Sequence, residues 1–253
     1  MGSVGPKILV LDIETRPNLA YVWGLWEQDV GLHQLVQAGS VICFAAKWVG
    51  KSKVHFASDF HDGHDKMIAR AHELIDEADA VVSYNGRAFD LKHLRREFLV
   101  AGLGPPSPHV DVDLLSVVRS KFKFASNKLA HVAAELGLEG KAETGGFDLW
   151  LRCIAGDKQA WATMRRYNVQ DVHLTEQLYH RLLPWIDGHP HWGLYGPRFE
   201  DEDRCQRCGS PELQRRGSYM TKVGRYPRFH CKKCGSWSRA RRRVGTVDAR
   251  GVA

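Results

Sequence analysis

The sequence contains no long hydrophobic run. None of its apolar stretches approaches the roughly 18 residues that cross a bilayer as a helix, and residues 1–6 do not join a basic region to an apolar one. A membrane span and a secretory signal are therefore not expected. Internal repeats and low-complexity segments are also lacking. We expect a globular protein of the cytosol with no membrane partner.

Cysteine is scarce, and its placement argues against a disulfide framework. Of the six cysteines, four form two C-x-x-C pairs, while Cys43 and Cys153 lie in apolar surroundings typical of buried core thiols. This usage favours a reducing compartment and a metal site.

Acidic residues are few in the last part of the chain, so the charge is uneven. Residues 201–253 contain 14 Lys and Arg against 5 Asp and Glu, whereas residues 1–200 contain 22 against 24, in a chain of net charge +7. A concentrated basic segment favours a polyanionic partner, most simply nucleic acid. A merely solubilising surface is the alternative, but it does not require the charge to be gathered in one segment.

Hydrophobic patterning predicts an α/β fold. Short apolar runs predict strands at 7–14, 40–49, 53–57, 80–84 and 109–112. Helical spacing predicts helices at 63–78, 89–100, 113–121, 127–136, 147–155 and 158–183. This order indicates a sheet flanked by helices, whereas residues 21–35 fit neither pattern.

The chain of 253 residues, 43% of them hydrophobic, is long enough for one sizeable domain and a small appendage. After Pro184 the composition becomes rich in Gly and Pro and then basic. We predict a domain at 1–186, a linker at 187–200, a cysteine module at 201–243 and a disordered tail at 244–253.

Two acidic residues stand near the end of the first predicted strand. Because strand side chains alternate between faces, Asp12 and Glu14 point to one side while Leu11 and Ile13 point to the other. Like charges held together favour a cation between them, and hard oxygen ligands suit Mg²⁺ or Mn²⁺. A solvated strand end is the alternative for an isolated pair.

Further acidic residues follow at a strand-to-helix turn and on the last long helix. Asp90 stands where the helix after Asn85-Gly86 begins, so a capping role is its alternative, and Asn85 alone would be a turn residue. Tyr167 and Asp171 are four residues apart, which places them on one helix face.

Together these residues resemble the DnaQ-like (DEDD) 3′–5′ exonuclease superfamily. The ordered set is Asp12-x-Glu14, Asn85-x-x-x-Phe89-Asp90 and Tyr167-x-x-x-Asp171, within residues 7–183. One branch of that superfamily has His five residues before the last Asp, where this chain has Arg166, and the other has Tyr four before it. The sequence therefore resembles the tyrosine branch, and the resemblance implies a ribonuclease H-like mixed central sheet flanked by helices.

The resemblance also implies an activity. Asp12, Glu14, Asp90 and Asp171 would hold two Mg²⁺ or Mn²⁺ ions, and Tyr167 would orient the attacking water. The expected reaction is 3′–5′ hydrolysis that releases nucleoside monophosphates, with DNA favoured over RNA and Asn85 supporting the substrate or the Asp90 turn. The alternatives are an endonuclease or structure-specific nuclease and a non-catalytic nucleic-acid-binding adaptor. Partners in replication or repair, and a bacterial or phage-infected cytosol, are further expectations.

The cysteine module resembles a zinc ribbon. Four cysteines in two C-x-x-C-G knuckles match one structural, tetrahedral Zn²⁺, ahead of a redox dithiol or an iron–sulfur cluster; they are Cys205, Cys208, Cys231 and Cys234. Basic residues around them are candidates for nucleic-acid binding: Arg215, Arg216, Arg225, Arg228, Lys232, Lys233 and Arg241. Interleaved aromatics offer either stacking surfaces or a small core, and for Phe229 and Trp237 both remain open.

Overall fold

The structure is a computed structural model that describes residues 5–138, 146–195 and 204–247. The described residues divide into two compact units. One spans Lys7–Tyr179, and the other joins the described part of Met1–Pro6 to that of His180–Ala253. Each unit is considered by itself.

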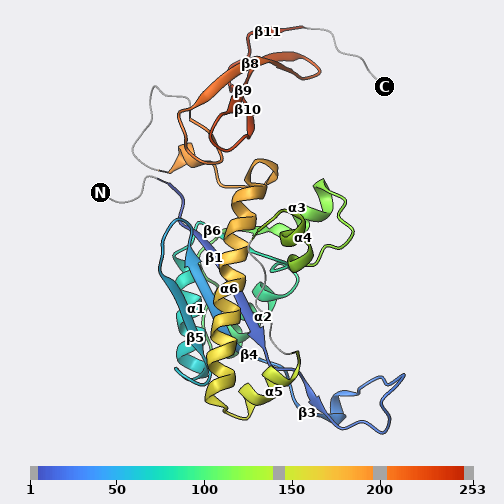
Figure 1. Ribbon diagram of the computed structural model, residues 1–253. Helices are drawn as coiled ribbons and strands as arrows, with labels where there is room; N and C mark the ends of the chain where they lie inside the picture. Colours follow the sequence, from blue (N-terminus) through green and yellow to red (C-terminus); the bar gives the residue numbers. More distant parts are fainter. Residues whose placement is uncertain (1–4, 139–145, 196–203, 248–253) are drawn as a thin grey trace. The chain divides into compact units, whose positions relative to one another are not determined.

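The larger unit is built on a five-stranded mixed sheet in the order β5-β4-β1-β6-β7 (Figure 1). Its strands are β1 (Ile8–Thr15), β4 (Val41–Trp48), β5 (Val54–Ser58), β6 (Ala80–Ser83) and β7 (Val110–Asp113). The β1–β4 and β4–β5 pairs are antiparallel, whereas β1–β6 and β6–β7 are parallel. Strand β1 is therefore central, with an antiparallel neighbour on one side and a parallel one on the other.

Helices cover both faces of this sheet (Figure 1). Their bounds are α1 (His64–Asp76), α2 (Asp90–Val100), α3 (Leu114–Lys121), α4 (Leu129–Glu135), α5 (Asp148–Ile154) and α6 (Lys158–Leu182). The ribonuclease H-like α/β prediction is confirmed, and the predicted strands and helices agree with these bounds to within two residues at each end.

The two faces of the sheet bury different residues of β1 and β4. Leu11 and Ile13 belong to a core cluster that includes the apolar residues of α1 and α2. On the other face, Cys43 of β4 packs with residues of α5 and α6, including Tyr167. The period-2 alternation of β1 therefore turns Asp12 and Glu14 away from the α1–α2 core.

The segment that the sequence left unassigned forms a small hairpin. Strands β2 (Leu19–Ala20) and β3 (Leu35–Gln37) pair antiparallel, and a short 3-10 helix, η1 (Leu32–Gln34), precedes β3. Between them Trp23 is 100% exposed and Trp26 84%. Because these rings are exposed, they add nothing to the core, and this explains why residues 21–35 lack a helix or strand periodicity.

The smaller unit contains a sheet in which β9 is the shared strand. Strands β8 (Leu213–Met220), β10 (Trp237–Arg239) and β11 (Gly245–Thr246) all pair with β9 (Gly224–Cys231) and run antiparallel to it. Two short 3-10 helices, η2 (Leu183–Trp185) and η3 (Trp192–Leu194), precede this sheet.

Two predicted boundaries differ from what the structure shows. The prediction of a disordered tail from residue 244 is corrected at its start, because Gly245 and Thr246 pair with β9; residues 248–253 lie outside the described residues. Within the predicted linker 187–200, the described part includes η3, and residues 196–200 are not described.

Among the described residues, no helix combines the length and the apolar character that a membrane crossing requires.

Candidate active site

The second half of strand β1 supplies two carboxylates to one side of the sheet. Asp12 lies opposite Ala45 of β4, and Glu14 lies opposite Cys43. The sheet therefore presents two carboxylates on the face that α5 and α6 cover.

Helix α6 brings the third carboxylate to the same place. Asp171 is buried, and its carboxylate groups with those of Asp12 and Glu14 so that one ligand atom of each lies within 4.8 Å of the others. The three residues come from positions about 160 residues apart in the sequence, so this convergence is a property of the fold. Three oxygen donors at this spacing can share a divalent cation.

Asn168 is a site residue that sequence reasoning missed. Its side chain is fully buried, and Nδ2 donates hydrogen bonds to Asp12 Oδ2 at 2.6 Å and to the Asp12 carbonyl at 3.3 Å. The first bond orients the Asp12 carboxylate, and the second ties the Asn168 side chain to the β1 backbone. The available signal was its spacing, three residues before Asp171 on the same helix face.

Asp90 approaches the site from the start of α2, after the turn that follows β6. The parallel pairing of β1 with β6 ends at Val10 and Val82. Beyond it, Asp90 Oδ1 accepts a hydrogen bond from the Ile13 amide at 3.1 Å. Asp90 is the first residue of α2 rather than its cap, which is Phe89. The capping alternative is therefore not what the structure shows: the carboxylate satisfies a β1 amide between Asp12 and Glu14.

The electrostatics of the site are those of crowded acids. Burial, and then the charges of Asp90, Glu14 and Asp171, hold the pKa of Asp12 well above its usual value, against the Asn168 hydrogen bond that lowers it. Burial also raises the pKa of Asp90 to about 7, and the hydrogen bond from Ile13 opposes that rise. The protein thus maintains like charges at a free-energy cost that a bound cation would relieve.

Tyr167 lies beside this cluster as a neutral phenol. Burial raises its pKa, as do the charges of Asp171, Glu14 and Asp12 and a hydrogen bond to Asp171. Its ring meets the Trp150 ring edge-on, with centroids 6.1 Å apart. A phenol with a raised pKa can donate a hydrogen bond but cannot serve as a base near neutral pH.

Asn85 is a turn residue in this structure. Its φ is 73°, a left-handed conformation in which Asn is among the tolerated residues, and its amide donates to Asp113 Oδ1 at 3.0 Å. Asp113 also caps α3 by accepting from the Leu115 amide at 3.0 Å. This network holds the β6–α2 turn in shape and so supports the position of Asp90.

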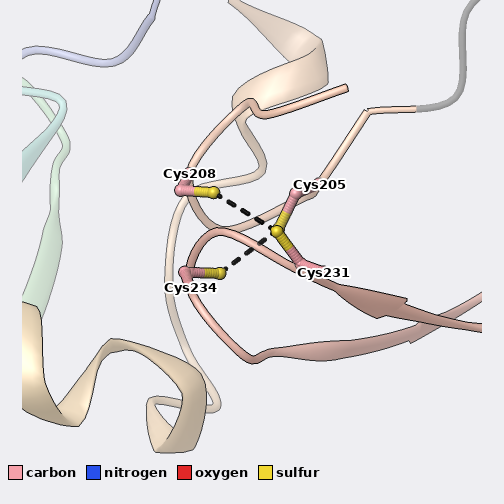
Figure 2. Close-up of side chains that lie close together, drawn as sticks. All are labelled: Cys205, Cys208, Cys231 and Cys234. Atoms are coloured by element: carbon pink, nitrogen blue, oxygen red, sulfur yellow. Dashed lines mark hydrogen bonds between the residues drawn. The ribbon is translucent and has the colours of Figure 1, made fainter. Parts of the chain in front are cut away.

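The four cysteines of the smaller unit form a second cluster, and their sulfur atoms lie within 4.8 Å of one another (Figure 2). Cys205 Sγ lies 3.6 Å from Cys234 Sγ, and Cys208 Sγ lies 3.7 Å from Cys231 Sγ. Four sulfurs at about 2.3 Å from a tetrahedral Zn²⁺ would be about 3.8 Å apart. The donor set and its spacing therefore fit this metal.

Both knuckles use the same backbone turn. The amide of Gly209 donates to the Cys205 carbonyl at 2.9 Å, and that of Gly235 donates to the Cys231 carbonyl at 3.0 Å. Both glycines have positive φ, at 69° and 79°. Although burial opposes ionisation, hydrogen bonds from Ser236 and from backbone amides lower the pKa of Cys205 to about 7, whereas burial raises the pKa of Cys208 and of Cys234. A thiolate is the form that binds metal.

The basic candidates lie on and around this cysteine unit. Arg215 and Arg216 are on β8, Arg225 and Arg228 are on β9, and the remaining three are outside the strands: Lys232, Lys233 and Arg241. All except Arg228 are exposed. Their arrangement leaves the charges accessible to a polyanion.

The fold and the acidic cluster define the class of protein. A five-stranded sheet of this order and direction, with helices on both faces, is a ribonuclease H-like fold. A family model described as RNase_H superfamily matches residues 9–183, so the chain belongs to the RNase H superfamily. Members of this superfamily are nucleic-acid hydrolases that use divalent metal ions.

A solved structure supports the same fold. The family B DNA polymerase from the hyperthermophilic archaeon Pyrobaculum calidifontis is similar with a TM-score of 0.54 and 19% identity, over 71% of this chain and 25% of the polymerase chain. The present chain thus spans about a quarter of the polymerase, and at this identity the likeness concerns the fold alone. No curated protein matches the sequence.

The raised pKa values predict a pH-dependent stability of the metal-free protein. The pKa of the Asp90 carboxyl is about 7 in the folded protein and about 3.8 in the unfolded chain. Its contribution to stability is therefore complete below pH 3.8 and is lost as the pH rises through about 7. We expect the melting temperature to fall between pH 5 and pH 8, and added Mg²⁺ or Mn²⁺ to raise it more at pH 8. Asp90→Asn should reduce both effects in scanning calorimetry. If the variant keeps the same dependence of melting temperature on pH, the raised pKa is not that of Asp90.

Proposed function

We propose that this protein is a divalent-metal-dependent 3′–5′ exonuclease that hydrolyses phosphodiester bonds at nucleic-acid 3′ ends and releases nucleoside monophosphates. DNA is the favoured substrate. Residues 1–186 would form the exonuclease domain, and residues 201–243 would form a zinc ribbon that aids nucleic-acid binding. The observation that carries the proposal is the convergence of Asp12, Glu14 and Asp171, with Asp90 bonded to the same strand.

The residues present fit a pair of Mg²⁺ or Mn²⁺ ions. The donors are carboxylate oxygens that crowd together, with Asp171 buried and Asp12 and Glu14 partly buried. Burial, and then the charges of the neighbouring acids, raise the pKa of Asp12. When bound, such ions activate water and neutralise charge on the reacting phosphate. Asp12, Glu14, Asp90 and Asp171 would hold them.

The remaining side chains would position the reacting groups. Asn168 holds the Asp12 carboxylate in one orientation through its 2.6 Å hydrogen bond. Tyr167 stays protonated, so its role is to orient a water molecule by hydrogen bonding rather than to remove a proton. The backbone amide of Asn85 holds the turn that precedes Asp90. This contact favours support of the Asp90 turn, rather than substrate binding, as the role of Asn85.

The direction of hydrolysis rests on the resemblance of the motifs to the tyrosine branch of the DnaQ-like superfamily. Incubation with 5′-labelled and 3′-labelled single-stranded DNA, duplex DNA and RNA, with and without Mn²⁺, tests it directly. We expect 3′-labelled DNA to release labelled mononucleotide at once and 5′-labelled DNA to shorten stepwise, in both cases only with the metal. Internal fragments would favour an endonuclease, and binding without cleavage would favour an adaptor.

A further inference from the structure

One face of the small sheet collects aromatic and basic side chains. Because strand residues alternate between faces, Tyr226, Arg228 and His230 of β9 share one side, while Pro227 and Phe229 share the other. One side of β9 therefore carries the Arg228 guanidinium between two rings, those of Tyr226 and His230.

The neighbouring strands continue this face. In the antiparallel register, Trp237 of β10 lies opposite His230, and Arg239 lies opposite Arg228. Tyr219 of β8 lies opposite Tyr226. Residues opposite each other in a ladder point to the same side. We call the resulting set the aromatic–arginine face: Tyr219, Tyr226, Arg228, His230, Trp237 and Arg239.

The guanidinium groups of this face are already placed on its rings. Arg228 Cζ lies 4.8 Å from the centroid of the Trp237 ring. Arg239 Cζ lies 4.2 Å from the Tyr226 ring and 5.7 Å from the Tyr219 ring. These contacts hold long side chains in fixed positions, so less conformational entropy is lost when a ligand binds.

The face is open to solvent rather than packed as a core. Trp237 is 47% exposed and Tyr219 48% exposed. Of the two readings left open for Trp237, the exposed surface is the one that the structure shows, whereas Phe229 is half-buried on the opposite side. Trp237 and Tyr219, with Gln206, Arg228, Ser238 and Arg239, line a cavity of about 370 Å³.

We propose that the aromatic–arginine face binds an unpaired nucleobase of single-stranded nucleic acid, which stacks on Trp237 and Tyr219 while the strand's phosphates meet the surrounding arginines. This inference rests on the proposed function in taking nucleic acid as the substrate class. Exposed rings paired with guanidinium planes supply the two surfaces on which bases stack. The excess of 14 basic over 5 acidic residues in 201–253 matches a phosphate backbone. An acidic protein segment would use the charges but not the rings.

The test compares strands that differ only in their bases. Full-length, zinc-replete protein without Mg²⁺ or Mn²⁺ is titrated, by fluorescence anisotropy, with labelled oligothymidylate and with an abasic strand of equal length and charge. We expect the abasic strand to bind about 10-fold more weakly, as loss of stacking predicts. Trp237→Ala should weaken oligothymidylate binding by a similar factor, change abasic binding little, and leave the salt dependence unaltered.

Arg215→Ala is the matched control. Arg215 is exposed and lies opposite Phe229, on the other side of the sheet. Because Arg215 lies away from the aromatic–arginine face, its loss should change the affinity for both strands by the same small factor and leave the ratio between them unaltered. Trp237→Phe should restore most of the base-dependent affinity, and zinc content checks folding; if Trp237→Ala loses zinc, Tyr219→Ala replaces it.

Equal affinity for the two strands, or an equal effect of Trp237→Ala on both, would overturn the proposal and leave a phosphate-binding or acidic-protein surface. The assay is independent of hydrolysis. A base-dependent affinity in a protein that cleaves nothing would therefore contradict the proposed exonuclease activity while retaining this inference.

Discussion

Asp171→Asn is expected to lower metal-dependent hydrolysis by about 1,000-fold or more, equivalent to about 4 kcal/mol of transition-state stabilisation. The substitution keeps the size of the side chain but removes one of the three charges gathered within 4.8 Å. It also removes the carboxylate that accepts the Tyr167 hydrogen bond. Initial rates on 3′-labelled single-stranded DNA with Mn²⁺ provide the measurement.

The matched control is Asp65→Asn, an exposed acid in the first turn of α1. It makes the same chemical change away from the acidic cluster and should leave the rate within about twofold, because isolated surface substitutions cost little. Thermal unfolding of both variants separates lost chemistry from lost folding. Full activity of the folded Asp171→Asn variant would exclude the assigned metal site.

Cys231→Ser is expected to unfold the cysteine module and leave the larger unit folded. Structural Zn²⁺ supplies about 10–16 kcal/mol of apparent binding energy in small zinc modules, more than such a module gains from its own core. Among the described residues 204–247, Cys205 and Cys231 are the only hydrophobic residues that are buried, so the module has little apolar core of its own. Tryptic cleavage within residues 204–243 and loss of bound zinc are the readouts.

Cys153→Ser controls for the loss of a buried thiol outside the four-cysteine cluster. Cys153 lies in the core between α5, α6 and β4, so its replacement should lower the melting temperature of the larger unit without releasing zinc. Nucleic-acid affinity should fall in Cys231→Ser and stay close to normal in Cys153→Ser. A module that resists trypsin after losing its zinc would contradict the structural role.

Periodicity was enough to place most of the acidic cluster. The alternation of β1 assigns Asp12 and Glu14 to one face, and helical spacing assigns Tyr167 and Asp171 to one face of α6. Periodicity could not reveal that Asn168 bonds to Asp12, because that contact depends on where α6 crosses β1. Sequence pattern also suggested a helix cap as an alternative for Asp90. Its actual role, accepting the hydrogen bond of the Ile13 amide, becomes visible only once β6 is known to end at Ser83 and to leave that amide without a strand partner.

The exposed hairpin region and the small sheet were harder to predict for different reasons. The two tryptophans between β2 and β3 contact too little of the core to leave a burial pattern. In the small sheet, the register that places Trp237 beside Arg228 is set by pairing with β9 and by the cysteine knuckles. Local sequence alone cannot determine which face each ring occupies.

The hydrogen bond from the Ile13 amide to Asp90 has a consequence for the choice of inactivating variants. Alanine at this position would leave a buried main-chain donor without an acceptor, at a cost of about 1–3 kcal/mol in folding. Asparagine keeps an oxygen there while removing the charge. Asp90→Ala would therefore combine a loss of folding stability with a loss of catalysis. Asp90→Asn, which has nearly the same shape, isolates the effect on catalysis.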